Sequence, residues 1–161
     1  MIKKFNLLFV TFFNIGKIKY APGTIASLFT CIFFYFITDI LDLTIILFFT
    51  FLIFLYSLIA INSVCESFES EDPPEIVVDE VVGQLLPLLA IPIYETLYPA
   101  PKIQYCVAVF LFFRLFDIWK PFPINYIDKN MKSSLGIMLD DIVAGIYTII
   151  IFALALFFIG A

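Results

Sequence analysis

The side chains best suited to chemistry are acids that stand in adjacent pairs beside apolar sequence. Asp79 and Glu80 follow a run of Ile and Val, and Asp140 and Asp141 lead into a long apolar run without a basic residue. Ionisable residues in such surroundings usually face a protein interior or a wet cavity, and they often mark function. Two neighbouring carboxylates also repel each other until a cation or a basic side chain compensates them. Capping of the last helix would need only one acid, so we interpret the pairs as a functional site.

A second group of charges follows another apolar run, with Arg114, Asp117 and Lys120 at steps of three. On a helix this spacing places the three side chains along one side. Arg offers a planar fork to phosphate oxygens and Lys a compact charge, so these two residues could hold a phosphate beside a metal bound by Asp117. The same spacing also fits an ordinary salt bridge, with Lys120 extending to the membrane surface. The two interpretations are evenly balanced in the sequence alone.

The residue types available for metal binding point to a hard cation. The chain has no His, and its three Cys residues are scattered through apolar sequence without a C-x-x-C pair. Each Cys is therefore expected to be a small buried hydrophobe. Oxygen ligands select hard cations, and Mg²⁺ usually shares its coordination sphere with water and substrate phosphate. We expect Mg²⁺ as the cofactor, with Asp79, Glu80, Asp140 and Asp141 as the metal ligands.

A weaker signal opens the first long apolar tract, at Ala21-Pro22-Gly23-Thr24. Gly23 allows close backbone approach, and Thr24 can act as a helix cap. The N-terminus of a helix is also a natural anion site. Ordinary capping is the simpler interpretation, and binding of a substrate phosphate by Gly23 and Thr24 is the functional one.

The composition places these charges in a membrane protein. Hydrophobic residues make up 63% of the 161 residues, compared with about 45–50% in soluble domains. A soluble core of this length could not bury so much apolar surface. We expect one membrane-embedded domain, residues 1–161, with an all-α fold. Nucleic-acid binding is excluded because no broad basic face is left to meet phosphates.

The apolar tracts predict a small helical bundle with about three spanning helices. Asp39 and Asp42 interrupt the first tract and predict a hairpin turn, whose first arm is slightly short for a span. Two other tracts are shorter still and are expected to lie at half depth or to pack within the protein. The expected spans are Thr24–Thr38, Leu43–Ile61 and Ile142–Ala161, and the shorter helices are Val81–Ile93 and Ile103–Phe113.

The distribution of Lys and Arg predicts the topology. Cytoplasmic segments carry an excess of these residues, which places the N-terminus and residues 62–80 and 114–141 in the cytoplasm. The turn at residues 39–42 and the C-terminus then lie outside. All three charge clusters meet on the cytoplasmic face under this topology. Lys102 is the exception, because it lies in a turn expected near the opposite face.

Four blocks that cover most of the chain resemble the phosphatidylglycerophosphatase A family. The blocks are residues 21–24 with Ser27, residues 72–73 with 78–83, residues 113–124, and residues 135–145. The resemblance implies a multi-pass, mainly helical protein of a bacterial inner membrane. It also implies an Mg²⁺-dependent phosphatase that converts the membrane lipid phosphatidylglycerophosphate into phosphatidylglycerol. The family's charged motif positions correspond here to Asp79, Glu80, Arg114, Asp117, Lys120, Asp140 and Asp141.

We hypothesise metal-assisted hydrolysis, in which Arg114 and Lys120 neutralise charge on the phosphoryl oxygens. The expected catalytic residues are Asp79, Glu80, Asp117 and Asp141. Direct attack by water and prior attack by an Asp both remain open, as do the number of metals, the range of substrates and a possible homo-oligomer.

The alternatives are an ion transporter and a noncatalytic membrane subunit with an acidic cation site. The three longest apolar segments carry no acid, which argues against transport. Helix capping in a noncatalytic subunit leaves the paired carboxylates unexplained. A CDP-alcohol phosphotransferase is disfavoured because its characteristic acid spacing, which begins Asp-Gly, is absent.

Overall fold

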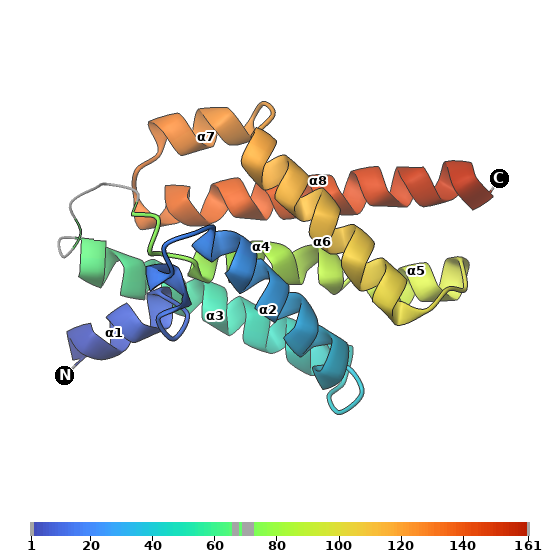
Figure 1. The fold of residues 1–161 in the computed structure, drawn as a ribbon, viewed down its shortest axis with the longest axis horizontal. Coiled ribbons are helices and arrows are strands. Elements are labelled where there is room, and N and C mark those ends of the chain that lie inside the picture. The colour runs from blue at the N-terminus through green and yellow to red at the C-terminus, as the bar shows by residue number, and fades with distance from the viewer. Residues whose placement is uncertain (1, 66–67, 69–72, 161) are drawn as a thin grey trace.

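The computed structural model describes residues 2–65, 68 and 73–160, and within these ranges it contains helices and no strands. This confirms the all-α fold (Figure 1). Four acids that precede Asp79, namely Glu66, Glu69, Glu71 and Asp72, lie outside the described residues. The elements are α1 (Ile2–Val10), the short 3₁₀ helix η1 (Ile15–Lys17), α2 (Pro22–Ile37), α3 (Leu43–Val64), α4 (Val78–Leu88), α5 (Ile91–Leu97), α6 (Lys102–Trp119), α7 (Ile124–Asn130) and α8 (Ser134–Gly160).

Within the described part of the chain, three helical segments are long and apolar enough to cross a membrane: Leu43–Val64, Val78–Leu97 and Ser134–Phe158. The expected number of spans is therefore confirmed, but the set differs. The first arm of the hairpin, α2, has only 16 residues, fewer than the roughly 20 that a span needs. The tract Val81–Ile93 was expected to be too short to span the membrane. This was wrong, because the helical segment that contains it runs from Val78 to Leu97. The helical segment begins at Val78, before the tract, and consists of α4 and α5 joined by a turn at residues 89–90.

Two other helices also extend into polar sequence. The tract Ile103–Phe113 forms the first part of α6, which continues past Arg114 and Asp117 to Trp119. The last helix begins at Ser134 rather than Ile142. Asp140 and Asp141 therefore lie in the second turn of α8 and cannot be its capping residues.

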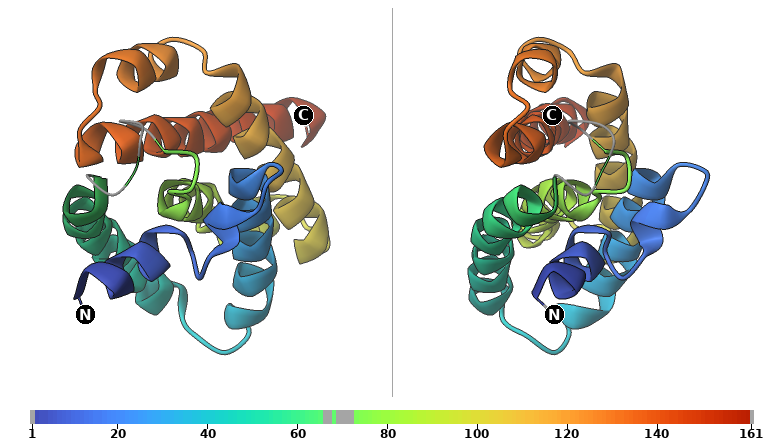
Figure 2. Two further views of the ribbon diagram at one scale, coloured as in Figure 1. Left: turned by 60° about the vertical axis from the view of Figure 1, so that its left-hand side comes forward. Right: turned by 90° about the vertical axis from the view of Figure 1, so that its left-hand side faces the viewer.

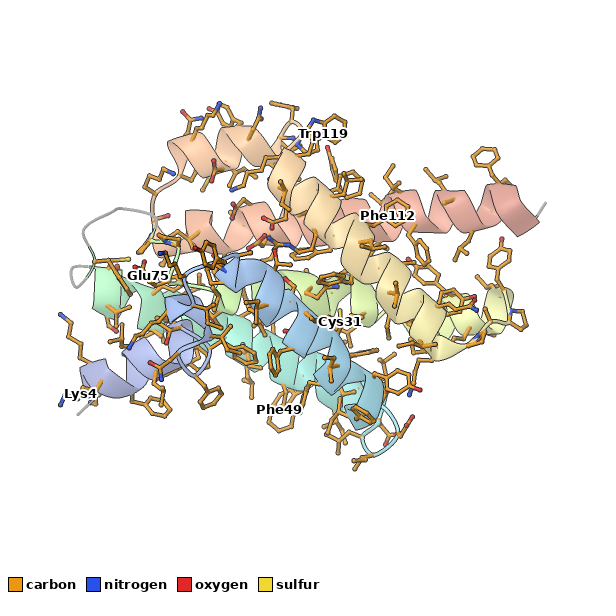
Figure 3. All side chains as sticks on the ribbon, viewed as in Figure 1. Lys4, Cys31, Phe49, Glu75, Phe112 and Trp119 are labelled. Carbon is orange, nitrogen blue, oxygen red and sulfur yellow. The ribbon has the colours of Figure 1, made fainter. Side chains whose placement is uncertain are left out.

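The central helix of the bundle is α4, which contacts α2, α3, α6 and α8. Figure 2 shows it enclosed by the other helices. Nearly all of its residues are buried, including the side chains of Leu85 and Leu88. This confirms that the short tract packs within the protein. Large apolar side chains cover the outside instead, as lipid contact requires: Phe49 is 52% exposed and Trp119 69% exposed (Figure 3).

The helices connect two polar ends of the bundle. The N-termini of α2, α4 and α8 and the C-termini of α3 and α6 lie at one end, and the α2–α3 and α5–α6 turns lie at the other (Figure 1). Lys102, the basic residue that did not fit the expected topology, lies at the second end. Its Nζ is 2.5 Å from Asp39 Oδ1 and 3.1 Å from Thr38 Oγ1. The ion pair neutralises this charge locally.

Two glycines allow α4 and α8 to pack with their backbones in close contact. A Cβ at Gly83 would lie 2.8 Å from the backbone oxygen of Asp141, and one at Gly145 would lie 2.6 Å from the backbone oxygen of Gly83. Contacts this short are not tolerated by a side chain, so only glycine fits at both positions. The contact joins the helices that carry the two acid pairs.

We predict that Gly145→Ala destabilises the protein by about 1–3 kcal/mol, because its methyl group forces α4 and α8 apart. The direction of the change in stability is informative, since Gly→Ala within a helix otherwise stabilises the protein by roughly 0.5–1 kcal/mol. Thermal unfolding in detergent measures the change. Ala153→Leu, at an exposed position of the same helix, is the matched control and should change little. A stabilised Gly145→Ala variant would contradict the close packing.

Candidate active site

Three carboxylates from two helices meet at one end of the bundle. Asp79 and Glu80 belong to the first turn of α4, and Asp141 belongs to α8. One carboxylate oxygen of each lies within 4.8 Å of the others. Asp79 and Asp141 are 8% and 3% exposed, so water does little to screen their mutual repulsion. The glycine contact between α4 and α8 forces the three acids together.

Several polar atoms around these acids have no hydrogen-bond partner among the described residues. They include Glu80 Oε2, Asp141 Oδ1, and both polar atoms of the Gln84 side chain. Buried polar atoms are normally paired, and those that are not call for a ligand, an ion or water. Converging carboxylate oxygens without imidazole or thiolate match the donor set of a hard divalent cation. These residues therefore fit a metal ion of the Mg²⁺ class.

Gln84 is a polar residue of this region that the sequence analysis did not identify. It is fully buried and lies four residues after Glu80, which places it on the same side of α4. Its amide can both donate to and accept from a water or a phosphoryl oxygen. A single carboxamide between Val and Leu residues was the signal that could have identified it.

Arg114 and Asp117 form the ion pair that their spacing allowed. Arg114 Nη1 lies 2.6 Å from Asp117 Oδ2, and both side chains are mostly buried. The same nitrogen lies 3.4 Å from Ser27 Oγ on α2, a weak hydrogen bond. Arg114 Nε is buried and has no hydrogen-bond partner in the described part of the chain. Asp117 therefore fixes the guanidinium while leaving part of it free to bind an anion.

Lys120 is held by two carboxylates rather than extended towards the membrane surface. Its Nζ lies 2.6 Å from Asp128 Oδ1 and 2.9 Å from Asp140 Oδ2. Burial lowers the pKa of Lys120, but the hydrogen bond to Asp128 and the charge of Asp140 outweigh it and raise the pKa above its ordinary value. Asp128 was missed in the sequence because this contact is tertiary and leaves no motif.

Asp140 is not one of the three converging acids, although the sequence placed it with them. Asp140 is directed to Lys120, whereas Asp141 is directed to α4. The other carboxylate oxygen of Asp140, Oδ1, is buried and has no hydrogen-bond partner among the described residues.

The N-terminus of α2 touches the acid group. Gly23 packs so closely against Glu80 that a Cβ would lie 1.8 Å from Glu80 Oε1. Thr24 follows at a half-buried position. Ser27, one turn later, donates to the backbone oxygen of Gly23. The structure therefore brings Gly23 to the predicted site, where a Cβ would fit only if the Glu80 carboxylate moved.

Together, the fold and the site define a helical membrane protein with a buried acid group, flanked by Arg and Lys, at one end of its bundle. The family model of phosphatidylglycerophosphatase A matches residues 8–156. The chain therefore belongs to the phosphatidylglycerophosphatase A family, as its motifs indicated, and is a phosphatase that hydrolyses a phosphomonoester.

Individual relatives agree with this assignment. The chain is 38% identical over 139 residues to phosphatidylglycerophosphatase A of Haemophilus influenzae, covering 86% of this chain and 81% of that protein. It is 34% identical over 159 residues to phosphatidylglycerophosphatase A of Escherichia coli, covering 92% and 79%. A Bacteroides thetaiotaomicron protein with the provisional name phosphatidylinositol-3-phosphatase is 36% identical over 157 residues, covering 96% and 95%. No solved structure matches the chain.

We predict that Asp141→Asn raises the thermal stability in EDTA by the equivalent of about 1–3 kcal/mol, because it relieves the repulsion among the three acids. Added Mg²⁺ should stabilise the wild type by binding the folded state and should stabilise the variant much less. Asp42→Asn, at an exposed acid of the opposite end, is the control and should change neither result. An equal response of wild type and Asp141→Asn to Mg²⁺ would argue against a cation among these acids.

We also predict that Lys120→Met destabilises the protein by about 1–3 kcal/mol, because Asp128 and Asp140 lose their partner. This loss of stability is smaller than the loss expected for a fully buried ion pair, since the Lys120 side chain is 29% exposed. Because its pKa is raised, Lys120 stays charged at any pH below about 10.4, the pKa of a lysine in the unfolded chain. The difference in stability between wild type and variant should therefore persist from about pH 7 to about pH 9. Lys129→Met, at an exposed lysine of α7, is the control in chemical unfolding. Equal effects of both substitutions would contradict the ion pairs.

Proposed function

We propose that the chain is an Mg²⁺-dependent phosphatidylglycerophosphate phosphatase, which removes the terminal phosphate and leaves phosphatidylglycerol. The observation that carries the proposal is the group of three acids with oxygens within 4.8 Å of one another, beside the Arg114–Asp117 pair. The names of two relatives support this substrate. Residues 1–161 would act as one membrane-embedded phosphatase domain.

Asp79, Glu80 and Asp141 would hold the Mg²⁺ ion. Asp140 remains a candidate ligand through Oδ1, the oxygen without a partner. When bound, the ion polarises the phosphoryl group and lowers the pKa of a coordinated water. The acids of this group are also candidates to accept a proton here, because the chain has no His.

Arg114 would neutralise the negative charge that develops on the phosphoryl oxygens in the transition state. Its planar fork binds two such oxygens, and Asp117 holds the fork in place. The first backbone N–H groups of α2, at Gly23 and Thr24, lack partners within the helix and point towards an anion at its N-terminus. Lys120 would act mainly on Asp140, with its third N–H left for phosphate.

The site would face the cytoplasm of a bacterial inner membrane. All nine Lys and Arg residues except Lys102 belong to segments at the end of the bundle that carries the acids. Cytoplasmic segments carry this excess of positive charge. The named relatives come from bacteria, which supports the compartment.

A second candidate substrate is phosphatidylinositol 3-phosphate. The relative with this activity in its provisional name aligns with 96% of the chain. Both lipids present a phosphomonoester on a polar headgroup, so the acid group and Arg114 would act in the same way. Contacts to the remainder of the headgroup would decide between them.

Phosphate release by purified protein in detergent tests the function, with both lipids as separate substrates. We expect release from phosphatidylglycerophosphate that requires Mg²⁺ and stops in EDTA. Asp79→Ala should lower kcat on the order of 10²-fold or more, and Arg114→Lys should do the same because it loses the fork. Asp42→Asn, remote from the site, should retain full activity.

The outcomes separate the alternatives clearly. Faster release from phosphatidylinositol 3-phosphate would reassign the substrate while leaving the site intact. Full activity of Asp79→Ala would remove the acid group from the mechanism. If folded protein released no phosphate with any divalent ion, the noncatalytic and ion-transporting alternatives would be favoured, and the acids would then be tested for cation binding alone.

A further inference from the structure

An apolar groove of about 300 Å³ lies between α2 and α6 on the outside of the bundle. Leu28 and Ile32 on α2 and Val107 on α6 form its walls and are each about half exposed. Cys31 and Cys106 form its floor, at 5% and 3% exposed; Cys31 is labelled on α2 in Figure 3. Carbon and sulfur make up almost the whole lining, so an occupant must be apolar.

The groove ends about one helical turn from residues of the candidate active site on both helices. Cys31 lies one turn after Ser27 on α2, and Phe110 lies one turn before Arg114 on α6. Residues four apart share a helix face, so Ser27 and Arg114 stand at the head of the groove. The hydrogen bond of 3.4 Å between Arg114 Nη1 and Ser27 Oγ joins the two helices at this point.

The length of the groove matches one leaflet of a bilayer. From Ser27 to Phe36, α2 rises roughly 14 Å at about 1.5 Å per residue, and half of a hydrocarbon core is roughly 15 Å. A polar group closes the far end, where Lys102 Nζ lies 4.7 Å from the centre of the Tyr35 ring and pairs with Asp39. The groove therefore begins at a phosphate-binding end and stops about one leaflet deeper.

We infer that the α2–α6 groove binds one acyl chain of the lipid whose phosphate is hydrolysed. This inference rests on the proposed function and adds to it the recognition of the lipid chain. A lipid that lies in the groove places its polar end at Arg114, whose buried Nε has no hydrogen-bond partner among the described residues. An apolar helix of a second copy could cover the walls, but it would leave this N–H without an acceptor. Charge and shape together favour the lipid.

The groove predicts selection by chain length among lipids with identical headgroups. We compare kcat/KM for phosphatidylglycerophosphate with two 16-carbon chains and with two 4-carbon chains, in mixed micelles at fixed surface concentration. Ile32→Trp fills the groove and should lower the ratio of long-chain to short-chain kcat/KM on the order of tenfold. Phe33→Trp is the matched control, since Phe33 is 62% exposed and lies beside the groove rather than in it. Its ratio should equal that of the wild type.

Two results would overturn the inference. An unchanged ratio in Ile32→Trp would mean that the acyl chain stays in the surrounding lipid. Equal loss on both substrates would mean that the substitution only perturbs the fold.

Native mass spectrometry with phosphatidylglycerol carrying 16-carbon chains tests binding without catalysis. Wild type and Phe33→Trp should retain one lipid per chain after the detergent is removed, and Ile32→Trp should lose it. A dimer that excludes the lipid would assign the groove to a second copy and overturn the inference. If the lipid is retained in the groove but no phosphate is released, the proposed function is wrong, while lipid binding by the groove is supported. If phosphate is released but no lipid is retained, only the inference about the groove is wrong.

Discussion

Repulsion among buried carboxylates is the constraint on which the rest of the structure depends. Asp79, Glu80 and Asp141 come within 4.8 Å of one another, in a place where water screens them poorly. Such a group persists only if packing elsewhere holds its helices together. The contact between Gly83 and Gly145 supplies that packing, and the acids are buried between the helices at one end of the bundle.

The other charges divide into those that support the site and those that stay available. Asp117 and Asp128 each hold a basic side chain, at 2.6 Å in both cases, and so fix its position. Arg114 keeps part of its guanidinium free, whereas Lys120 is engaged by two acids. The spacing of Arg114, Asp117 and Lys120 therefore fits both the salt-bridge and the phosphate-binding interpretation. The ion pairs orient the basic groups that would bind phosphate.

Much of the fold and of the site could be predicted from sequence because lipid imposes strong rules on composition. Apolar length indicated helices, and paired acids beside apolar tracts indicated a site near the lipid headgroups. The length of the Val78–Leu97 segment was not predictable in this way, because protein contacts allow polar turns to stay helical. The contact of Asp128 with Lys120 was missed for a similar reason. It depends on which helices become neighbours and does not follow from local spacing.

The length of α8 beyond its acids fixes how deep the site lies. The helix continues from Ile142 to Gly160, roughly 28 Å at about 1.5 Å per residue, which is close to a hydrocarbon core of about 30 Å. In a thinner or thicker bilayer the helix must tilt or the lipid must deform to match it. Hydrophobic mismatch along α8 would then raise or lower the acids relative to the headgroup plane. The thickness of the bilayer would thereby change how easily a lipid headgroup reaches the site.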